Sequence, residues 1–126
     1  MTGKTEETGL NSLIIGDHIE FDTVRRIKKK ILYTERMVSD LLCYEPGQGT
    51  VVHHHNTDDE AFYVIEGRGT ITVGGEVHDV EPTSLVFAPM GEEHGIEAAK
   101  DSRLVIIYFR APGRNTARPG LQPNLN

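Results

Sequence analysis

Short stretches in which apolar and polar residues alternate recur along most of this chain, and they are bounded by Gly, Pro, Asn and Asp. Alternation with a period of two residues is typical of a strand that buries one face. Helix signals are weak throughout. The pattern predicts strands at 12–16, 19–22, 31–34, 37–44, 50–55, 61–66, 70–73, 76–80, 84–88, 94–98 and 103–109.

Two glycine-containing turns join these predicted strands closely. Gly74-Gly75 separates two alternating segments and predicts a two-residue hairpin, because both central positions of that turn favour positive φ. Gly67-Arg68-Gly69 predicts a second tight connection. Many short strands joined by regular turns indicate an all-β sandwich or barrel.

The length of the chain favours a single domain. It has 126 residues, of which 37% are hydrophobic and 25% charged, and this suits a globular protein with one core. We expect the domain to span residues 1–110. Residues 111–126 are rich in Pro, Gly, Asn and Arg and have little to bury, so they predict a flexible C-terminal tail or a strap across a partner subunit.

Charge and cysteine content narrow the classes of protein further. The net charge of −6 argues against a nucleic-acid binder, which needs a basic surface. The basic run Lys28-Lys29-Lys30 is interpreted as a solvated strand or loop edge, with a functional anion patch as the alternative. Cys43 is the single cysteine and predicts a small core residue rather than a disulfide.

The apolar stretches argue against a targeting or membrane segment. Residues 1–9 are polar and lack the basic start and apolar stretch of a signal peptide. The strongly apolar stretch at 104–109 is too short to cross a bilayer. We therefore expect a cytoplasmic protein that contacts neither membrane nor nucleic acid.

Three consecutive histidines are the most informative feature for function. On a strand, His53 and His55 face one side and His54 the other. The segment 56–59 is a good turn. If it closes a hairpin, His55 and Glu60 face each other with Cβ atoms roughly 5 Å apart. That spacing suits two ligands of one metal ion.

The same hairpin would place His53 on the metal-facing side, with Phe62 opposite it as a wall of the site. A further histidine, His94, follows the turn Pro89-Met90-Gly91, and tertiary folding would have to bring it to the others. The rival carboxylates Asp58 and Asp59 lie in the turn and point inward less reliably. The remaining histidines are interpreted as surface residues, namely His18, His54 and His78.

At these residues the sequence resembles the cupin superfamily. Its first motif is G-x5-H-x-H-x4-E-x6-G, and every position is matched by Gly47, His53, His55, Glu60 and Gly67. The match supports a metal site at the two histidines and the glutamate.

The second cupin motif, G-x5-P-x-G-x2-H-x3-N, is matched in part. Pro89, Gly91 and His94 fit it, whereas Thr83 replaces its first glycine and Ala98 its terminal asparagine. Neither departure removes a ligand. The two motifs span residues 47–98, and the short segment between them resembles that of small microbial single-domain cupins.

The resemblance implies a single-domain jelly-roll β-barrel, the double-stranded β-helix of six to eight strands, and a homodimer. It also implies one divalent transition metal per subunit, held by His53, His55, Glu60 and His94. Imidazole and carboxylate ligands do not choose sharply among Fe, Mn, Ni, Zn, Co and Cu.

Four protein ligands leave two positions on an octahedral ion. A small carboxylate, hydroxy acid, keto acid or diketone would chelate there, and the ion would act as a Lewis acid. Dioxygenase chemistry is ranked first because cupins with these ligands often perform it. Isomerase, lyase or decarboxylase chemistry fits the same site. The alternative is a non-catalytic small-molecule-binding or sensor cupin with a structural or absent metal.

Four residues are candidates for catalytic roles. Glu60 is the carboxylate nearest the reaction, although metal binding makes it a poor general base. Tyr63, Arg36 and Arg103 lie on candidate strands and are candidates to line the pocket. An inward Arg would fix a substrate carboxylate through paired hydrogen bonds, and an outward strand position is the alternative for each Arg.

Overall fold

Ten β-strands and one short 3-10 helix form the regular structure of a computed structural model that describes residues 11–54, 58–112 and 120–121. The helix is η1 (Ile15–His18). The strands are β1 (Ile27–Tyr33), β2 (Val38–Tyr44), β3 (Gly49–His53), β4 (Asp59–Gly67), β5 (Gly69–Val73), β6 (Glu76–Val80), β7 (Leu85–Ala88), β8 (His94–Ala98), β9 (Leu104–Ala111) and β10 (Gly120–Leu121).

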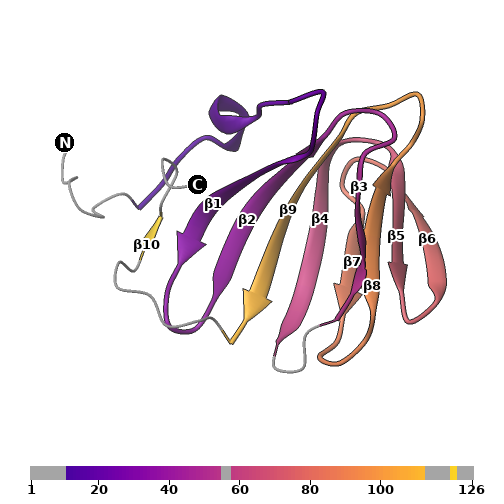
Figure 1. Cartoon of the computed structure of the whole chain (residues 1–126). Helices are drawn as coiled ribbons and strands as arrows, with labels where there is room; N and C mark the ends of the chain where they lie inside the picture. Colours follow the sequence, from indigo (N-terminus) through magenta and orange to yellow (C-terminus); the bar gives the residue numbers. More distant parts are fainter. Residues whose placement is uncertain (1–10, 55–57, 113–119, 122–126) are drawn as a thin grey trace.

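The strands form two antiparallel sheets that face each other (Figure 1). The larger sheet has the order β10-β1-β2-β9-β4-β7, and the smaller has the order β3-β8-β5-β6. The larger sheet has six strands and the smaller four, so the part of the larger sheet that contains β1 extends beyond the smaller sheet. The predicted all-β jelly-roll barrel is confirmed.

The core fills the space between the sheets towards the end of the barrel where β4 and β8 finish. Alternation along each strand brings one set of side chains inward, so both sheets contribute to one cluster. The fully buried members of this cluster include Tyr44, Phe62, Val64, Ile71, Leu104 and Ile106. At the other end of the barrel the inward positions become polar, and the candidate site lies there.

The predicted strands at 12–16 and 19–22 are wrong. This segment contains η1 and crosses the outer face of the larger sheet. Its apolar side chains pack on a second cluster around Leu41, Cys43 and Val105, so their alternation reflects burial of one side of a covering segment. The covering residues are Leu13, Ile15, Ile19 and Phe21.

The first strand begins earlier than predicted and includes the basic run. The alternation within β1 gives its three lysines different surroundings. Lys29 faces the N-terminal segment and pairs with Glu20 at 2.8 Å. Lys28 faces the other way, with its Nζ 3.8 Å from Asp40. The run is therefore part of a paired strand, and only one side of it faces the barrel interior.

Part of the predicted C-terminal tail pairs with the larger sheet. Within the tail, Gly120 is the register partner of Tyr33 and Leu121 of Leu32. The remainder of the tail, at 113–119 and 122–126, lies outside the described residues.

Both predicted glycine turns are present. Gly74 and Gly75 have φ values of 57° and 85° and join β5 to β6 in a hairpin, as the sequence predicts. Gly67, with φ of 84°, begins the short connection from β4 to β5.

Thr83 occupies a backbone conformation that favours glycine. Its φ is 74°, and it stands where the second cupin motif has its first glycine. A left-handed conformation costs an L-residue roughly 1–2 kcal/mol, whereas glycine loses about 0.5–1 kcal/mol through chain entropy. We predict that Thr83→Gly raises the free energy of unfolding by up to about 1 kcal/mol in urea titrations. A lower free energy of unfolding would contradict this account.

Candidate functional site

A cavity of about 260 Å³ opens between the sheets at the polar end of the barrel. Residues from both sheets and from the segment before β1 surround it. They are Arg26, Lys28, Leu42, Thr50, His53, Glu60, Phe62, His94, Gly95, Ile96, Tyr108 and Arg110.

Three of the predicted metal ligands meet in this cavity. His53 and His94 are register partners across β3 and β8, and their ring centroids lie 4.6 Å apart. Glu60 comes from the facing sheet, with its Oε2 atom 3.4 Å from Nε2 of His94. Both Glu60 and His94 are buried. The fourth predicted ligand, His55, lies outside the described residues.

The predicted hairpin, in which the strand of His53 and His55 would pair with the strand of Glu60 and Phe62, is not formed. β3 pairs with β8, whereas β4 pairs with β7 and β9 in the other sheet. His53 and Glu60 therefore line the cavity from opposite sheets and not from neighbouring strands of one sheet. Phe62 is not a register partner of His53, but it does line the cavity, with its ring centroid 5.6 Å from that of His94.

Backbone carbonyls orient both imidazoles. Nδ1 of His53 donates to the carbonyl oxygen of Val51 at 2.9 Å, and Nδ1 of His94 donates to that of Glu92 at 3.2 Å. When Nδ1 carries the proton of a neutral imidazole, Nε2 carries the lone pair. Metal-binding histidines typically have their second nitrogen held in this way.

Glu60 changes the proton affinity of His94. Burial lowers the pKa of His94, but the hydrogen bond and negative charge of Glu60 raise it, and the net result is a pKa above the ordinary value. A proton and a metal ion compete for the same Nε2 lone pair. The contact with Glu60 therefore favours the protonated form of His94, and a metal ion at Nε2 would have to displace that proton.

The donor set suits a divalent transition metal. Within the described residues, no three His, Cys, Asp or Glu side chains are close enough together to form a complete metal site, and His55 is outside that set. His53, Glu60 and His94 nevertheless supply two imidazoles and one carboxylate to one cavity. Such ligands accept Mn, Fe, Co, Ni, Cu or Zn.

Basic side chains line another part of the cavity. Nε of Arg110 lies 3.1 Å from Oδ2 of the buried Asp58. Nε of Arg26 donates to the hydroxyl of Thr50 at 3.0 Å, and that hydroxyl also bonds to Tyr44 at 2.9 Å. Both guanidinium groups are therefore held in place through Nε.

A buried carboxylate, Asp40, lies behind the cavity wall. It accepts hydrogen bonds from the hydroxyls of Tyr108, which lines the cavity, and Tyr33. Burial and the charge of Asp40 raise the pKa of Tyr33 to about 12, and the same causes raise the pKa of Tyr108 well above its usual value. Tyr108 therefore stays protonated and presents a fixed hydroxyl oxygen.

The other predicted catalytic residues lie away from this cavity. Tyr63 is on the outer face of β4, because alternation directs it opposite to Glu60. Arg36 lies in the exposed turn between β1 and β2. Arg103, at the other end of the barrel, pairs with Glu45 at 2.9 Å and stacks over Phe21.

The two rival carboxylates of the turn have separate structural roles. Asp58 is buried beside Arg110, and the side chain of Asp59 accepts a hydrogen bond from the backbone N–H of Met90 at 2.8 Å. The second contact fixes the turn that precedes His94.

Arg26 and Arg110 were not singled out from the sequence, and Lys28 was noted only as part of the basic run, with a functional anion patch as the alternative. Arg26 and Lys28 lie two residues apart on either side of the start of β1, and this spacing is the signal for a shared inward face. Arg110 follows Tyr108 at the same spacing on β9. These signals become visible once β1 is known to begin before the basic run.

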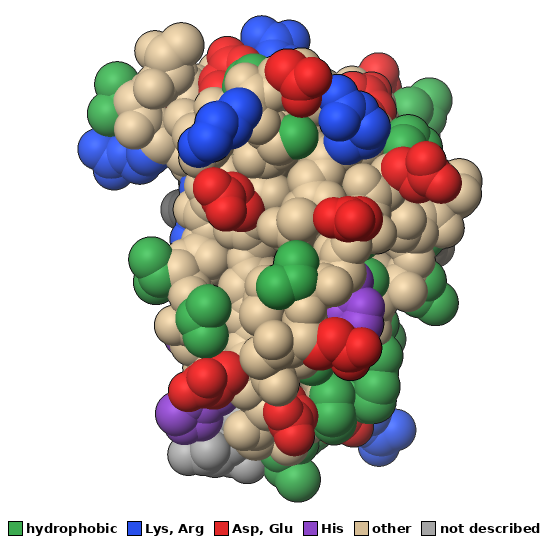
Figure 2. All heavy atoms as spheres, turned by 90° about the vertical axis from the view of Figure 1, so that its right-hand side faces the viewer, with side chains coloured by type: hydrophobic (Ala, Val, Ile, Leu, Met, Phe, Trp, Pro, Cys, Tyr) green, Lys and Arg blue, Asp and Glu red, His purple; other side chains and the backbone are tan. Residues whose placement is uncertain are grey.

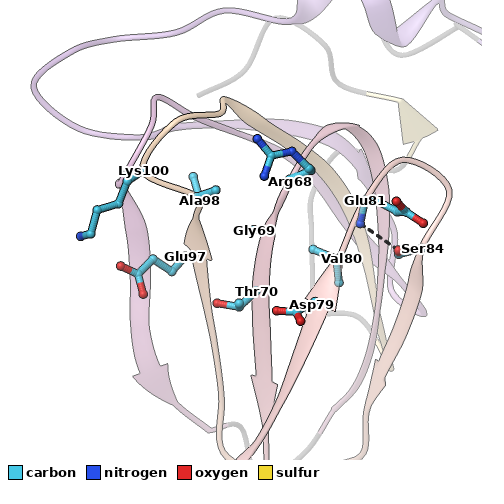
Figure 3. Close-up of a pocket in the computed structure, with 11 residues that line it drawn as sticks. Arg68, Gly69, Thr70, Asp79, Val80, Glu81, Ser84, Glu97, Ala98 and Lys100 are labelled. Carbon is cyan, nitrogen blue, oxygen red and sulfur yellow. Dashed lines mark hydrogen bonds between the residues drawn. The ribbon is translucent and has the colours of Figure 1, made fainter.

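A larger hollow, of about 590 Å³, lies at the opposite end of the smaller sheet (Figure 3). Arg68 at its rim pairs with Asp101, and the backbone N–H of Glu81 donates to the hydroxyl of Ser84. Thr70, Asp79 and Glu97 lie along neighbouring strands rather than around one point. The cavity with the histidines, although smaller, is the candidate functional site.

A family model described as a cupin domain matches residues 40–109, which include most of the larger sheet and the whole smaller one. The chain belongs to the cupin domain family. This cupin is also similar in fold to the protein TT1209 from Thermus thermophilus. The TM-score is 0.78 at 28% sequence identity, covering 82% of this chain and 98% of that one.

Two curated relatives each match about half of the cupin. The uncharacterized protein MJ1618 of Methanocaldococcus jannaschii is 35% identical over 66 residues, 52% of this chain and 53% of that protein. The 5-nitrosalicylic acid 1,2-dioxygenase of Bradyrhizobium sp. is 29% identical over 68 residues, 52% of this chain and 32% of that enzyme. The match thus spans about half or less of each relative.

No helix in the described part of the chain is long and apolar enough to cross a membrane. The cytoplasmic location and the homodimer stay predictions.

Proposed function

We propose that this cupin is a metal-dependent enzyme that acts on a small, oxygen-rich molecule in the cavity beside His53, Glu60 and His94. The observation that carries the proposal is the orientation of the two imidazoles. Each donates Nδ1–H to a backbone carbonyl and keeps Nε2 for a ligand bond. Glu60 adds a buried carboxylate at the same point. His55, the second histidine of the first motif, is proposed as the fourth ligand.

A divalent transition metal bound there supplies Lewis-acid chemistry, and Fe or Cu also supplies reactivity towards dioxygen. The residues of the chain provide the surroundings. Phe62 and Ile96 give the cavity apolar walls that limit water. The Tyr108 oxygen, whose proton is donated to Asp40, can accept a hydrogen bond from a substrate hydroxyl. Arg110 adds positive charge next to Glu60, its register partner on β9.

Dioxygenase-type chemistry is the first reaction class that we propose. The similarity to a part of 5-nitrosalicylic acid 1,2-dioxygenase supports it, because 68 residues of this chain match that enzyme at 29% identity. Isomerase, lyase or decarboxylase chemistry would use the same ligands. The substrate is a hydroxy acid, keto acid or diketone whose neighbouring oxygens chelate the metal.

The second candidate is a non-catalytic small-molecule-binding or sensor cupin. The contact between Glu60 and His94 favours it, since protonation of His94 would give the pair balanced charges without a metal ion. In that case the cavity would bind its ligand through Arg26, Tyr108 and Arg110.

Metal analysis followed by oxygen-uptake measurements tests the first candidate. The chain is loaded with Fe(II) under anaerobic conditions and then exposed to oxygen with a panel of hydroxy acids, keto acids and diketones. We expect about one tightly bound ion per chain and uptake with one substrate class. Absence of a stoichiometric ion, together with ligand binding that survives the double change His53→Ala and His94→Ala, would favour the second candidate.

A further inference from the structure

One cation of the cavity is paired differently from the others. Lys28 lies near Asp40, and Arg110 lies 3.1 Å from Asp58. Arg26 instead donates to the neutral hydroxyl of Thr50, and no carboxylate in the described part of the chain forms an ion pair with it. A half-buried cation held by a neutral partner is a suitable site for an external anion.

The position of Arg26 is fixed by a chain of polar contacts. The buried Tyr44 bonds to the Thr50 hydroxyl at 2.9 Å, and Thr50 accepts the hydrogen of Arg26 Nε at 3.0 Å. Because Nε is used, the edge of the guanidinium that carries the two terminal nitrogens is the part that can meet a ligand. A planar guanidinium edge of this kind matches a carboxylate through two parallel hydrogen bonds.

This cationic end is separated from the histidine end. Thr50 pairs with Ile96, and His53 pairs with His94, so the two ends are two residues apart along β8. At the rise of a β-strand this is roughly 7 Å. Both ends line one cavity, so one small molecule can contact both.

Arg26, just before β1, and Lys28, within it, are both next to the cavity, and Lys28 is also partly exposed. β1 lies on the side where the larger sheet extends beyond the smaller one (Figure 1), and Lys28 also lines the cavity. Figure 2 shows the side of the molecule nearest β5 and β6, where acidic side chains lie among hydrophobic ones and most of the basic side chains stand towards the upper end of the view. Arg26 and Lys28 therefore bring positive charge to the cavity.

We infer that Arg26, assisted by Lys28, binds a carboxylate of the ligand at the end of the cavity away from His53 and His94. This carboxylate site deepens the proposed function. It rests on that function because it assumes that the other end of the ligand contacts the metal. The ligand then carries a carboxylate distant from its chelating oxygens. Short dicarboxylic hydroxy or keto acids belong to this class, whereas diketones and simple monocarboxylic acids do not.

Binding of two matched acids tests the inference. 2-Oxoglutarate and 2-oxopentanoate share their chelating end and chain length, but only the first has a distal carboxylate. Isothermal titration calorimetry with the 126-residue chain, both metal-loaded and chelator-treated, should show at least about tenfold tighter binding of 2-oxoglutarate. A tenfold difference corresponds to about 1.4 kcal/mol, which a charge-assisted hydrogen-bonded contact is strong enough to supply.

Neighbouring residues provide matched control variants. Arg26→Gln should reduce the preference for 2-oxoglutarate to within about threefold, whereas Arg25→Gln, which removes the same charge at an exposed position, should leave it intact. Lys28→Gln should weaken 2-oxoglutarate binding a few-fold, because Lys28 is partly exposed, and Lys29→Gln should not. Each variant is checked for an unchanged melting temperature.

Several results would overturn the inference: no measurable 2-oxoglutarate binding, equal affinity for the two acids, or equal effects of Arg25→Gln and Arg26→Gln. The proposed function is tested separately. An Arg26-dependent preference in a protein that neither retains metal nor consumes oxygen would support the carboxylate site and contradict the metalloenzyme. Metal binding and turnover without that preference would do the reverse.

Discussion

Replacing His53 with alanine should abolish tight metal binding, whereas the same change at the adjacent His54 should leave it intact. His53 faces the cavity with Nδ1 held by Val51, and His54 is exposed. Even the loss of an outer-shell partner typically lowers metal affinity about 10- to 100-fold, so loss of a direct ligand should lower it by more than about 100-fold. The metal content after dialysis, measured by mass spectrometry, checks this prediction.

The same pair of variants should differ in how chelation changes their stability. A metal present at about 1,000 times its dissociation constant stabilises the folded state by about 4 kcal/mol. Chelation should therefore lower the melting temperature of the metal-loaded wild type and of His54→Ala by roughly 15 °C. His53→Ala should show no such decrease. Equal metal content and equal chelation effects in the two variants would remove His53 from the site.

Gly67→Ala should be among the most destabilising single substitutions in this chain. A Cβ at this position would lie 1.7 Å from the carbonyl oxygen of Arg103, and the backbone has φ of +84°. The clash is with the backbone at the start of the neighbouring strand, so it cannot be relieved by a side-chain rotation. Strain and overpacking together should cost about 3–5 kcal/mol of unfolding free energy, measured by urea denaturation.

Gly75→Ala is the control for this effect. Gly75 has nearly the same φ, +85°, but nothing lies within 4 Å of its Cβ position. Only the backbone strain applies, and the expected cost is about 1–2 kcal/mol. Similar losses in both variants would mean that the close approach of β4 to β9 at Gly67 is not what requires glycine there.

The strands and turns of the smaller sheet could be predicted from the sequence because their signals are local. Alternation defines β5 and β6, and the positive φ of Gly74 and Gly75 requires the residues found there. The segment at 12–22 has similar alternation but covers the outer face of the larger sheet. Local periodicity shows that one side of a segment is buried, but it does not show whether the segment is hydrogen-bonded to a neighbouring strand.

The site was predicted only in part, because motif spacing is local whereas strand pairing and long-range contacts are not. Motif spacing identified His53, Glu60 and His94, and the structure brings these three to one cavity. The prediction of a hairpin was wrong because a short connection between two strands does not show whether they share a sheet. The position of Arg26 depends on where β1 begins and on its contact with Thr50, which is 24 residues away in sequence.

The larger sheet is wider than the smaller one, and as a result the residues of β1 beside the cavity are separate from the residues that form the core between the sheets. The core between the sheets contains residues of β2, β4, β5, β6, β7, β8 and β9, and in the described part of the chain none from β1. The inward side of β1 therefore faces the ligand without supporting that core. Substitutions at Arg26 and Lys28, which line the cavity, can change which molecule is accepted at little cost in stability, so this edge is where new specificities can arise by mutation or be introduced by design.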